Sequence, residues 1–564
     1  MKETYINILN IRRMAFEHIA KIAFENRPIY DIATEVFDIL PGEEASYREN
    51  IFRERAVMGE RLRMGVGLHA RTADKTGAIT DGLDDEDFDI KKYEPPLVSV
   101  IKIACEACPE NRVEVTNTCR ACIAHPCVNV CPKNAITYTS KGSIIDQDKC
   151  IKCGKCVEAC PYNAIAHTKR PCAESCGVKA IKSDKLGRAE IDDDKCVACG
   201  RCITSCPFGA ISDKTEIYQL AKALNTDKHV YAIVAPSFVR QFGQMASPVQ
   251  IKEAIRELGF RDVIEVGLGA DLTTLNEAHE YVESVPEKIP FMGTSCCYSW
   301  KLMVKKKFPE INDKISESST PMIYSGKHIK KMDEKAQVAF IGPCISKKLE
   351  ARRPEVAETI DYVITYEELM GMFLAKDIDP AEIKIEEDWQ DASETGRNYA
   401  VSGGVAEAVK RRIAEINPDL EVNVEKAEGL ADCVKLAQMA KLGRKDGLLL
   451  EGMACVGGCV GGPGTLISEL KTGKAVKQFA KESIYKSPYD NKNIPEEDKP
   501  KDWKNKSIEI CSQSVDKLSS TNIGLQKLLI SKFQNSKNAN SLTRWQINSL
   551  KLCQWHGFNI YPSE

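Results

Sequence analysis

The spacing of hydrophobic positions divides this chain into segments. Near the N-terminus apolar residues recur every three or four positions, as on the buried side of an amphipathic helix. That stripe consists of Ile11, Met14, Ala15, His18, Ile19 and Ile22. The basic residues Arg12, Arg13 and Lys21 fall on or beside the other face. We therefore predict a helical N-terminal region with a linker over residues 1–100.

Short apolar runs alternate with helical patterns between residues 228 and 475. The run Val230–Ala235 is followed by Ser247 and Pro248, an N-cap and a first-turn proline for a helix that should stop at Gly259. Further strand candidates are residues 263–267, 338–341, 362–365 and 448–450. Alternating strands and helices predict an α/β domain with parallel sheets.

Cysteine is concentrated in one stretch of the chain. Of the 24 cysteines, sixteen lie between Cys105 and Cys206, which in a large chain without an export signal indicates metal sites rather than disulfides. Two runs have the bacterial ferredoxin spacing, in which the fourth cysteine ligates the other cluster of a pair. These runs are Cys150, Cys153, Cys156 and Cys160 before Pro161, and Cys196, Cys199, Cys202 and Cys206 before Pro207. We predict an α+β, ferredoxin-like iron–sulfur domain over residues 101–215.

The remaining cysteines of this stretch are less regular. One run, Cys119, Cys122, Cys127 and Cys131, has a longer middle gap. Cys172 and Cys176 form a half-motif. The pair Cys105 and Cys108 either ligates a fourth cluster or consists of free thiols. We predict three to four accessory 4Fe–4S clusters that carry electrons between a surface donor and a buried reaction site. Their pairing stays open: the irregular run shares ligands with its neighbour, or the two regular runs pair together.

Five more cysteines occur in three glycine-flanked motifs in the second half of the chain. The motifs are Gly293–Trp300 with Cys296 and Cys297, Gly342–Lys348 with Cys344, and Glu451–Cys459 with Cys455 and Cys459. Four thiolates suffice for one cubane cluster, which leaves Cys296 as a spare thiol beside a ligand. Two of the motifs follow predicted strands, and ligand sites in open α/β sheets lie beyond the carboxyl ends of strands.

Together, these three motifs resemble those of the iron–iron hydrogenases, and the resemblance extends over residues 100 to 475. It implies two parallel-sheet lobes around an active H-cluster. Cys297, Cys344, Cys455 and Cys459 would hold the cubane, and Cys459 would bridge to a two-iron subcluster with carbonyl, cyanide and dithiolate-amine ligands. It also implies maturation proteins that install this subcluster and ferredoxin, or a similar carrier, as the electron partner.

The resemblance further assigns roles to side chains around the cluster. Cys296 would exchange protons with the bridging amine, and the relay would continue through Glu277, Ser316 and Glu280. Without the resemblance, Glu277 and Glu280 would equally suit a solvated helix face, since a spacing of three puts both on one side. The remaining residues would contact the two-iron unit. Lys347 would donate a hydrogen bond to a cyanide ligand, as would Ser237, which lies beside Pro236. Met453 would pack against the unit.

Some positions depart from the family pattern, which indicates a divergent branch. Tyr298 replaces a proline, Gly342 a methionine and Met322 a glutamine, and the glycine-rich end reads Gly461-Gly462-Pro463-Gly464. These positions surround the two-iron unit, so they affect its redox potential and proton affinity rather than the number of ligands.

The function implied is the reversible oxidation of hydrogen to protons. A hydrogenase-like redox sensor with slow turnover and a cubane-only iron–sulfur assembly protein are the alternatives. The proton-path residues Cys296, Glu277, Glu280 and Ser316 disfavour the sensor, and the presence of Cys296 and Lys347 disfavours the assembly protein. The net charge of −3 argues against a nucleic-acid partner, and no apolar run long enough for a membrane span occurs. Met1–Asn26 lacks signal-peptide features, so we expect a cytoplasmic protein. Cys433 is predicted to be a core thiol, and no chemistry is assigned to the tail, residues 476–564.

Overall fold

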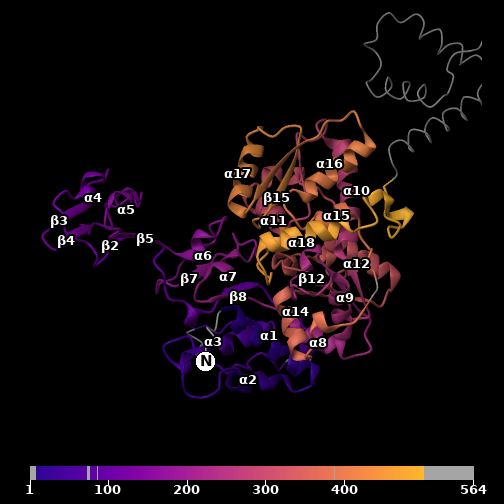
Figure 1. Ribbon diagram of the computed structural model, residues 1–564, viewed down its shortest axis with the longest axis horizontal. Coiled ribbons are helices and arrows are strands. Elements are labelled where there is room, and N and C mark those ends of the chain that lie inside the picture. The colour runs from indigo at the N-terminus through magenta and orange to yellow at the C-terminus, as the bar shows by residue number, and fades with distance from the viewer. Residues whose placement is uncertain (1–7, 73–76, 85–86, 386–387, 501–564) are drawn as a thin grey trace, which may run out of the picture. The chain divides into compact units, whose positions relative to one another are not determined.

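Figure 1 shows the protein as a computed structural model. The structure describes residues 8–72, 77–84, 87–385 and 388–500. The chain divides into one compact unit of Met1–Arg412 with Val422–Ile494, and a second of Ile413–Glu421 with Pro495–Glu564. Among the described residues, no helix combines the length and apolar character that a membrane span needs. The predicted tail lies mostly at 501–564, outside the described residues.

The N-terminal part of the first unit is helical. Its helices are α1 (Ile8–Phe24), α2 (Ile32–Ile39) and α3 (Ile51–Gly65). The predicted apolar stripe is confirmed, since Ile19 and Ile22 are fully buried. The α1 helix packs against α8 (Ile217–Leu224) and α14 (Tyr366–Ala375) (Figure 1). Arg12 departs from the prediction: it is buried, because its guanidinium pairs with Glu367 of α14 at 2.7 Å.

The cysteine-rich stretch folds into two-stranded antiparallel sheets and short helices, as predicted for an α+β domain. The strand pairs are β1 (Val98–Val100) with β8 (Ile211–Asp213), β2 (Asn111–Val115) with β5 (Ile165–Lys169), β3 (Ile136–Thr139) with β4 (Gly142–Ile145), and β6 (Ile181–Ser183) with β7 (Ala189–Ile191). The helices are α4 (Pro126–Asn129), α5 (Lys155–Ala159), α6 (Pro171–Glu174) and α7 (Arg201–Ser205).

A four-stranded parallel sheet forms the first lobe of the α/β domain, in the order β10-β9-β12-β13. Its strands are β9 (Val230–Val234), β10 (Asp262–Glu265), β12 (Gln337–Ile341) and β13 (Tyr362–Ile364). Alternate residues of β9 enter different cores: Ala232 packs with α8, α9 (Pro248–Glu257) and α14, while Ile233 packs with α10 (Val266–Ser284) and α12 (Pro321–Met332). Helices therefore cover both faces of the sheet.

The predicted start and end of α9 are confirmed. Ser247 accepts a hydrogen bond from the Gln250 backbone in a capping box, and Gly259 has a φ of +111° just past the helix. The strand predicted for residues 263–267 ends two residues early, because Val266 and Gly267 open α10. At Gly267 a Cβ would lie 2.5 Å from that of Ala392, so the missing side chain lets α10 approach its neighbour.

A three-stranded parallel sheet, β11-β15-β14, forms the second lobe. Its strands are β11 (Met292–Gly293), β14 (Asn423–Glu428) and β15 (Leu448–Met453). The strand predicted at 448–450 continues to Met453, because its pairing with β14 continues to Glu428. The helices α11 (Tyr298–Lys307) and α17 (Leu430–Lys441) share a core with this sheet. The prediction of two parallel-sheet lobes is confirmed.

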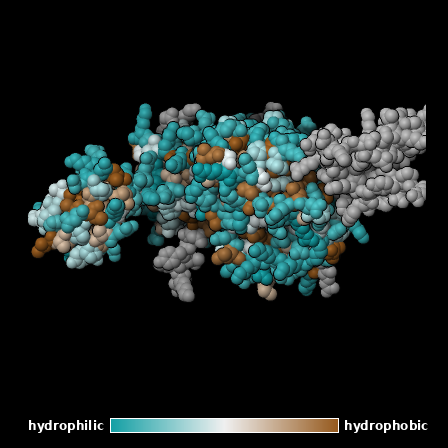
Figure 2. All heavy atoms as spheres, turned by 90° about the horizontal axis from the view of Figure 1, so that it is seen from above, coloured by the Kyte–Doolittle hydropathy of each residue, from teal (hydrophilic) through white to brown (hydrophobic). Residues whose placement is uncertain are grey.

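Further helices and 3₁₀ turns complete the described chain. The remaining helices are α13 (Ser346–Glu350), α15 (Glu394–Asn398), α16 (Gly404–Ile416) and α18 (Glu469–Lys481). The 3₁₀ helices are Ile29–Asp31, Phe88–Ile90, Lys102–Ala104, Pro236–Phe238, Pro309–Lys314, Pro354–Val356, Pro380–Glu382, Cys459–Gly461, Pro488–Asp490 and Glu496–Asp498. Hydrophilic side chains dominate the face shown in Figure 2, with only scattered hydrophobic patches.

Candidate metal centre

The three cysteine motifs of the α/β domain converge at the ends of its strands. Cys344 follows β12, Cys455 follows β15, and Cys297 is the N-cap of α11. Burial, together with the charges of Cys344 and Cys297, raises the pKa of Cys459 to about 12. Burial and the charge of Cys297 likewise raise the pKa of Cys344 to about 11. Each thiol thus lies within electrostatic range of the others.

This donor set fits an iron–sulfur cubane. Every cysteine in the described residues is a free thiol, so disulfides do not account for the grouping. Bare thiolates packed together and shielded from water repel one another, which is why burial and mutual charge raise their pKa. Binding to a metal deprotonates such thiols and removes the conflict.

Glycines allow the ligand loops to approach one another. A Cβ on Gly462 would lie 2.8 Å from the Cβ of Pro343, next to Cys344. Gly458 has a φ of +90°, and a Cβ there would lie 2.6 Å from the Ser402 nitrogen. Side chains at these positions would push the Cys459 loop away from its neighbours.

Cys296 is buried beside this thiol group. Burial, followed by the charges of Cys297 and Cys459, raises the pKa of Cys296 well above its ordinary value. The Nζ of Lys347 donates to the backbone oxygen of Cys296 at 3.2 Å. Lys347 is therefore turned towards the centre, as expected from its place three residues after Cys344.

A buried carboxylate that the sequence analysis missed holds Lys347. Oε2 of Glu350 accepts from Lys347 at 2.6 Å, and its Oε1 accepts from Thr320 at 2.9 Å. Glu350 is 1% exposed. The signal available in the sequence was the spacing of three between Lys347 and Glu350, which a helix places on one face.

The predicted relay residues lie in one region, although a hydrogen bond joins only some of them. Ser316 donates to Oε2 of Glu280 at 2.5 Å. Oε1 of Glu277 accepts from the Ser295 backbone at 2.6 Å, whereas Oε2 is buried without a hydrogen-bond partner in the described part of the chain. Burial raises the pKa of Glu277 to about 7. Lys301, which the sequence analysis missed, donates to the Ser316 carbonyl at 2.9 Å.

Three further predicted residues are buried. Ser237 and Pro236 lie in the 3₁₀ helix after β9, and Met453 shares a small core with Cys296 and Tyr399. The Tyr366 hydroxyl donates to the Ala235 carbonyl at 3.0 Å, so the 2.8 Å contact between Ser237 and Tyr366 has Ser237 as donor. In this arrangement the Ser237 hydroxyl is directed at Tyr366.

One departure from the family pattern has a steric cause. A Cβ on Gly342 would lie 2.6 Å from the Phe340 ring and 3.0 Å from Ala235, so Phe340 fills the space that a side chain would need. Tyr298 is the first residue of α11, and Arg353 lies 5.7 Å from its ring centroid. Met322 is fully buried in the core under the first sheet.

One carbonyl of the cysteine-rich stretch is hydrogen-bonded to residues beside this centre. The Val197 carbonyl accepts from the hydroxyls of Ser299 and Ser346, each at 3.2 Å. These serines lie two residues after Cys297 and Cys344, and Val197 follows Cys196. The charge of Cys199 also contributes to the raised pKa of Cys455, after burial and the nearer thiols. The thiols around Cys199 are therefore neighbours of the centre.

Eight of the accessory cysteines line two cavities, four in each. One cavity is lined by Cys131, Cys150, Cys153 and Cys156. A second is lined by Cys105, Cys108, Cys172 and Cys206. Burial raises the pKa of Cys202 well above its ordinary value, and the charges of Cys199, Cys196 and Cys176 add to this. The other accessory cysteines are placed by single contacts. Cys119 lies next to Gly142, and Cys122 follows it by three residues. Cys127 contacts Ser143 at 3.5 Å, and the thiol of Cys160 accepts a hydrogen bond from the Ala164 amide.

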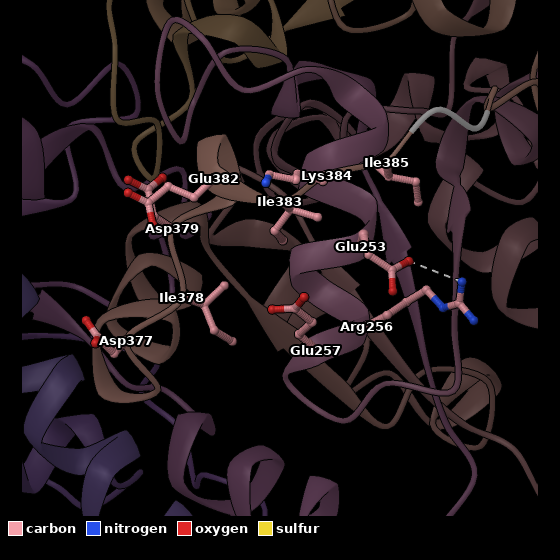
Figure 3. A pocket seen from close by; sticks show the side chains of 10 residues that line it. All are labelled: Glu253, Arg256, Glu257, Asp377, Ile378, Asp379, Glu382, Ile383, Lys384 and Ile385. Atoms are coloured by element: carbon pink, nitrogen blue, oxygen red, sulfur yellow. Dashed lines mark hydrogen bonds and ion pairs between the residues drawn. The ribbon is translucent and has the colours of Figure 1, made fainter.

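An open pocket lies elsewhere, between α9 and the segment after α14 (Figure 3). It is lined by Glu253, Arg256, Glu257, Asp377, Ile378, Asp379, Glu382, Ile383, Lys384 and Ile385. Glu253 pairs with Arg256 at 3.2 Å. No cysteine is among the lining residues, so this pocket is separate from the thiol centre.

Comparison with protein families shows which kinds of domain the chain contains. A profile described as "Iron only hydrogenase large subunit, C-terminal domain" matches residues 228–463. A "4Fe-4S dicluster domain" matches residues 149–210, and an "LdpA Fe-S cluster-binding domain" matches residues 119–169. The chain therefore carries a hydrogenase-type domain and iron–sulfur domains.

The relatives include hydrogenases and an assembly factor. Iron hydrogenase 1 of Clostridium pasteurianum is 30% identical over 305 residues, 45% of this chain and 53% of its own length. The NADP-reducing hydrogenase subunit HndD of Solidesulfovibrio fructosivorans is 29% identical over 44% of this chain and 52% of its own length. The cytosolic Fe-S cluster assembly factor NAR1 of Meyerozyma guilliermondii is 30% identical over 134 residues, 21% of this chain and 25% of its own. This chain thus matches about half the length of the first two relatives.

Among solved structures, a variant of [FeFe]-hydrogenase HydA1 from Chlamydomonas reinhardtii matches with a TM-score of 0.42 and 23% identity, over 50% of this chain and 93% of that one. The type of the α/β domain is supported instead by the profile over residues 228–463 and by the relatives. On these grounds, residues 228–463 form a domain of the iron-only hydrogenase large-subunit type, and iron–sulfur domains precede it along the chain.

Proposed function

We propose that this protein catalyses the reversible oxidation of hydrogen to protons and electrons. The observation that carries the proposal is the surplus thiol: Cys296 is buried against the four-thiol group yet is not needed to complete it. A cubane needs only four thiol ligands, whereas proton chemistry at a dry site also needs a donor beside the cluster.

The H-cluster is the group that we propose for this site. Cys297, Cys344, Cys455 and Cys459 would hold its cubane, with Cys459 as the bridge to the two-iron subcluster. When bound, the cluster supplies the redox chemistry of hydrogen. Met453 and Pro236 would exclude water from the two-iron side, and Lys347 would donate hydrogen bonds to anionic ligands there. Ser237 would do the same only after turning its hydroxyl away from Tyr366.

Protons would reach Cys296 through the polar side chains behind it. The proposed order is Glu280 at the half-buried end, then Ser316, then Glu277. Two observations support it: the hydrogen bond of Ser316 to Glu280, and the unpartnered Oε2 of buried Glu277, which can accept a further proton donor. A carboxyl whose pKa is about 7 can both take up and release protons at neutral pH.

Electrons would arrive through the accessory 4Fe–4S clusters, three or four in number. The Val197 carbonyl, held by Ser299 and Ser346, supports the thiols around Cys199 as the last step before the centre. A ferredoxin or similar carrier is the proposed external partner, and maturation proteins would install the two-iron subcluster. The domain boundaries at residues 100, 215 and 475 and the cytoplasmic location also remain predictions.

Anaerobic maturation in vitro tests the proposal. The iron-loaded protein would be treated with a synthetic two-iron precursor, then assayed for hydrogen evolution from reduced methyl viologen and for hydrogen uptake. We expect both activities after maturation and neither before it. The absence of both in protein that has bound the precursor would contradict the proposal.

A second function is favoured by one comparison. The similarity to the assembly factor NAR1 covers 134 residues at 30% identity, the same identity as that to the clostridial hydrogenase. An assembly role would require cubane iron alone. In that case the protein would not retain the two-iron precursor, and hydrogen turnover would be absent.

A further inference from the structure

The loops around the accessory cysteines repeat one backbone conformation. Each first cysteine is followed two residues later by a residue in the left-handed region, which non-glycine residues seldom adopt. Two regular runs show this at Lys152, φ +58°, and Ala198, φ +51°. The irregular run shows it at Ala121, φ +47°. The isolated pair, Cys105 and Cys108, shows it at Ala107, φ +46°.

A second repeated conformation marks the last cysteine of each run. The residue three positions later has a positive φ in every case: Asn134, Asn163, Lys179 and Gly209. The next amide donates to the thiol, at 3.2–3.4 Å: Ala135 to Cys131, Ala164 to Cys160, Ala180 to Cys176, and Ala210 to Cys206. The half-motif that ends at Cys176 therefore closes like a complete run.

These repeats imply that the isolated pair and the half-motif are two parts of one run. Cys105 and Cys108 have the opening conformation, while Cys172 and Cys176 have the closing one. Residues 109–171 separate them. We propose that this split run, paired with the run from Cys196, builds a fourth accessory 4Fe–4S site whose ligands are Cys105, Cys108, Cys172 and Cys206.

The cavity and its surroundings support this ligand set. All four thiols line the same cavity, and backbone amides of Ala189 and Ala210 donate to Cys105 and Cys206 at 3.3 Å. Amide-to-sulfur hydrogen bonds are one means by which proteins set cluster potentials. Arg170 is 3% exposed and donates to the Cys108 carbonyl at 2.8 Å, which places a buried cation beside an anionic cluster.

The chain between the two parts folds as an insertion. The strands β2 and β5 pair from Asn111 with Lys169 to Val115 with Ile165, so the two ends of the insertion lie side by side. The Arg170 amide donates to the Glu110 carbonyl at 3.2 Å and closes the junction. One two-cluster ferredoxin module is thus inserted into the first ligand run of another.

The nested arrangement also decides between the pairings left open by the sequence. Cys131 lines the cavity with Cys150, Cys153 and Cys156, so the irregular run exchanges its last cysteine with the neighbouring regular run. Cys160 is then left for Cys119, Cys122 and Cys127. Cys206 lines one cavity with Cys172, which leaves Cys176 for Cys196, Cys199 and Cys202. The two regular runs, although one dicluster profile spans both, do not pair with each other.

This inference is tested by measuring the iron content of protein produced without the maturation proteins. It rests on the proposed iron–sulfur chemistry but not on hydrogen turnover. Five cubanes, four accessory and one active, would give about 20 irons per chain in the wild type. A wild type with about 16 irons or fewer after full reconstitution would overturn the fourth site.

Variants then test the ligand set. Cys105→Ala/Cys108→Ala should lose about four irons, and adding Cys206→Ala should cost no more, since all three serve one cluster. Adding Cys196→Ala/Cys199→Ala to the first pair should instead remove about eight irons in total. Cys433→Ala, which removes a buried thiol on α17 that is assigned to no cluster, is the control and should keep all iron. Unchanged iron in Cys105→Ala/Cys108→Ala, or a further loss with Cys206→Ala, would overturn the proposal.

Discussion

Lys347 donates a hydrogen bond to the backbone oxygen of Cys296 at 3.2 Å, so one ammonium group joins two of the three cysteine motifs. The same ammonium is held by Glu350 at 2.6 Å. Because the bond goes to the backbone, it fixes the Cys296 loop and leaves the thiol free. This combination of a fixed backbone and an uncommitted sulfur is what a proton donor at a metal centre requires.

Replacing this thiol should separate turnover from cluster binding. We expect Cys296→Ala to lower hydrogen evolution by at least about 100-fold, the usual contribution of a positioned proton donor, while iron content stays at the wild-type level. Hydrogen evolution and iron should be measured on the same matured sample. Near-normal turnover by this variant would rule out Cys296 as the proton donor.

The ion pair behind Lys347 should matter for stability. Glu350→Gln leaves a buried ammonium without its counter-charge, which should cost about 3 kcal/mol and lower the melting temperature of the iron-loaded protein. The exposed pair of Lys435 and Asp432 on α17 provides the control: Asp432→Asn should change stability by less than about 1 kcal/mol. Equal effects of the two substitutions would contradict the role of Glu350.

Local patterns in the sequence were sufficient for the elements that carry the cysteines. The N-cap at Ser247 and the apolar run of β9 depend on neighbouring residues only, and both are confirmed. The positions of Cys344 and Cys455 after β12 and β15 follow from the general placement of sites in parallel sheets.

Features that depend on distant residues were not predictable from the same patterns. The strand β14 (Asn423–Glu428) is mostly polar and exposed, and only its pairing with β15 makes it a strand. Arg12 looked like a surface residue because its partner, Glu367, lies far along the chain. The sequence did not reveal that the pair at Cys105 and the half-motif at Cys172 form one run, because only the pairing of β2 with β5 brings the two parts together.

Glu277 should make stability depend on pH. Burial raises the pKa of Glu277 to about 7, above the ordinary value of 4.5, so the folded state holds this proton more tightly than the unfolded chain. Its contribution is fully present below pH 4.5 and is lost as pH rises through about 7. Relative to the Glu277→Gln variant, the free energy of unfolding of the wild type should therefore fall by about 3 kcal/mol across this pH range.

Melting temperatures of the two iron-loaded proteins between pH 5 and pH 8 provide the measurement for Glu277. We expect the variant to melt increasingly above the wild type as pH rises. A difference that stays constant with pH, or that narrows towards pH 8, would show that Glu277 is ionised at neutral pH with an ordinary pKa.

The close packing of the ligand loops should make one glycine indispensable. In Gly462→Ala the new Cβ would lie 2.8 Å from Pro343, which should separate the Cys459 and Cys344 loops and lower the iron of the active cubane by up to about four per chain. Gly473→Ala on α18 is the matched control, because its nearest neighbour would be 3.9 Å away. Full iron in Gly462→Ala would show that the loops can part without loss of the cluster.

Infrared spectroscopy of the matured protein tests the central claim most directly. Metal-bound carbonyl and cyanide absorb in a region where proteins do not, so the bands report the two-iron subcluster without any assay of turnover. We predict both sets of bands in the wild type, their persistence in Cys296→Ala, and their loss in Cys344→Ala. A fully iron-loaded wild type that shows neither carbonyl nor cyanide bands after maturation would contradict the account.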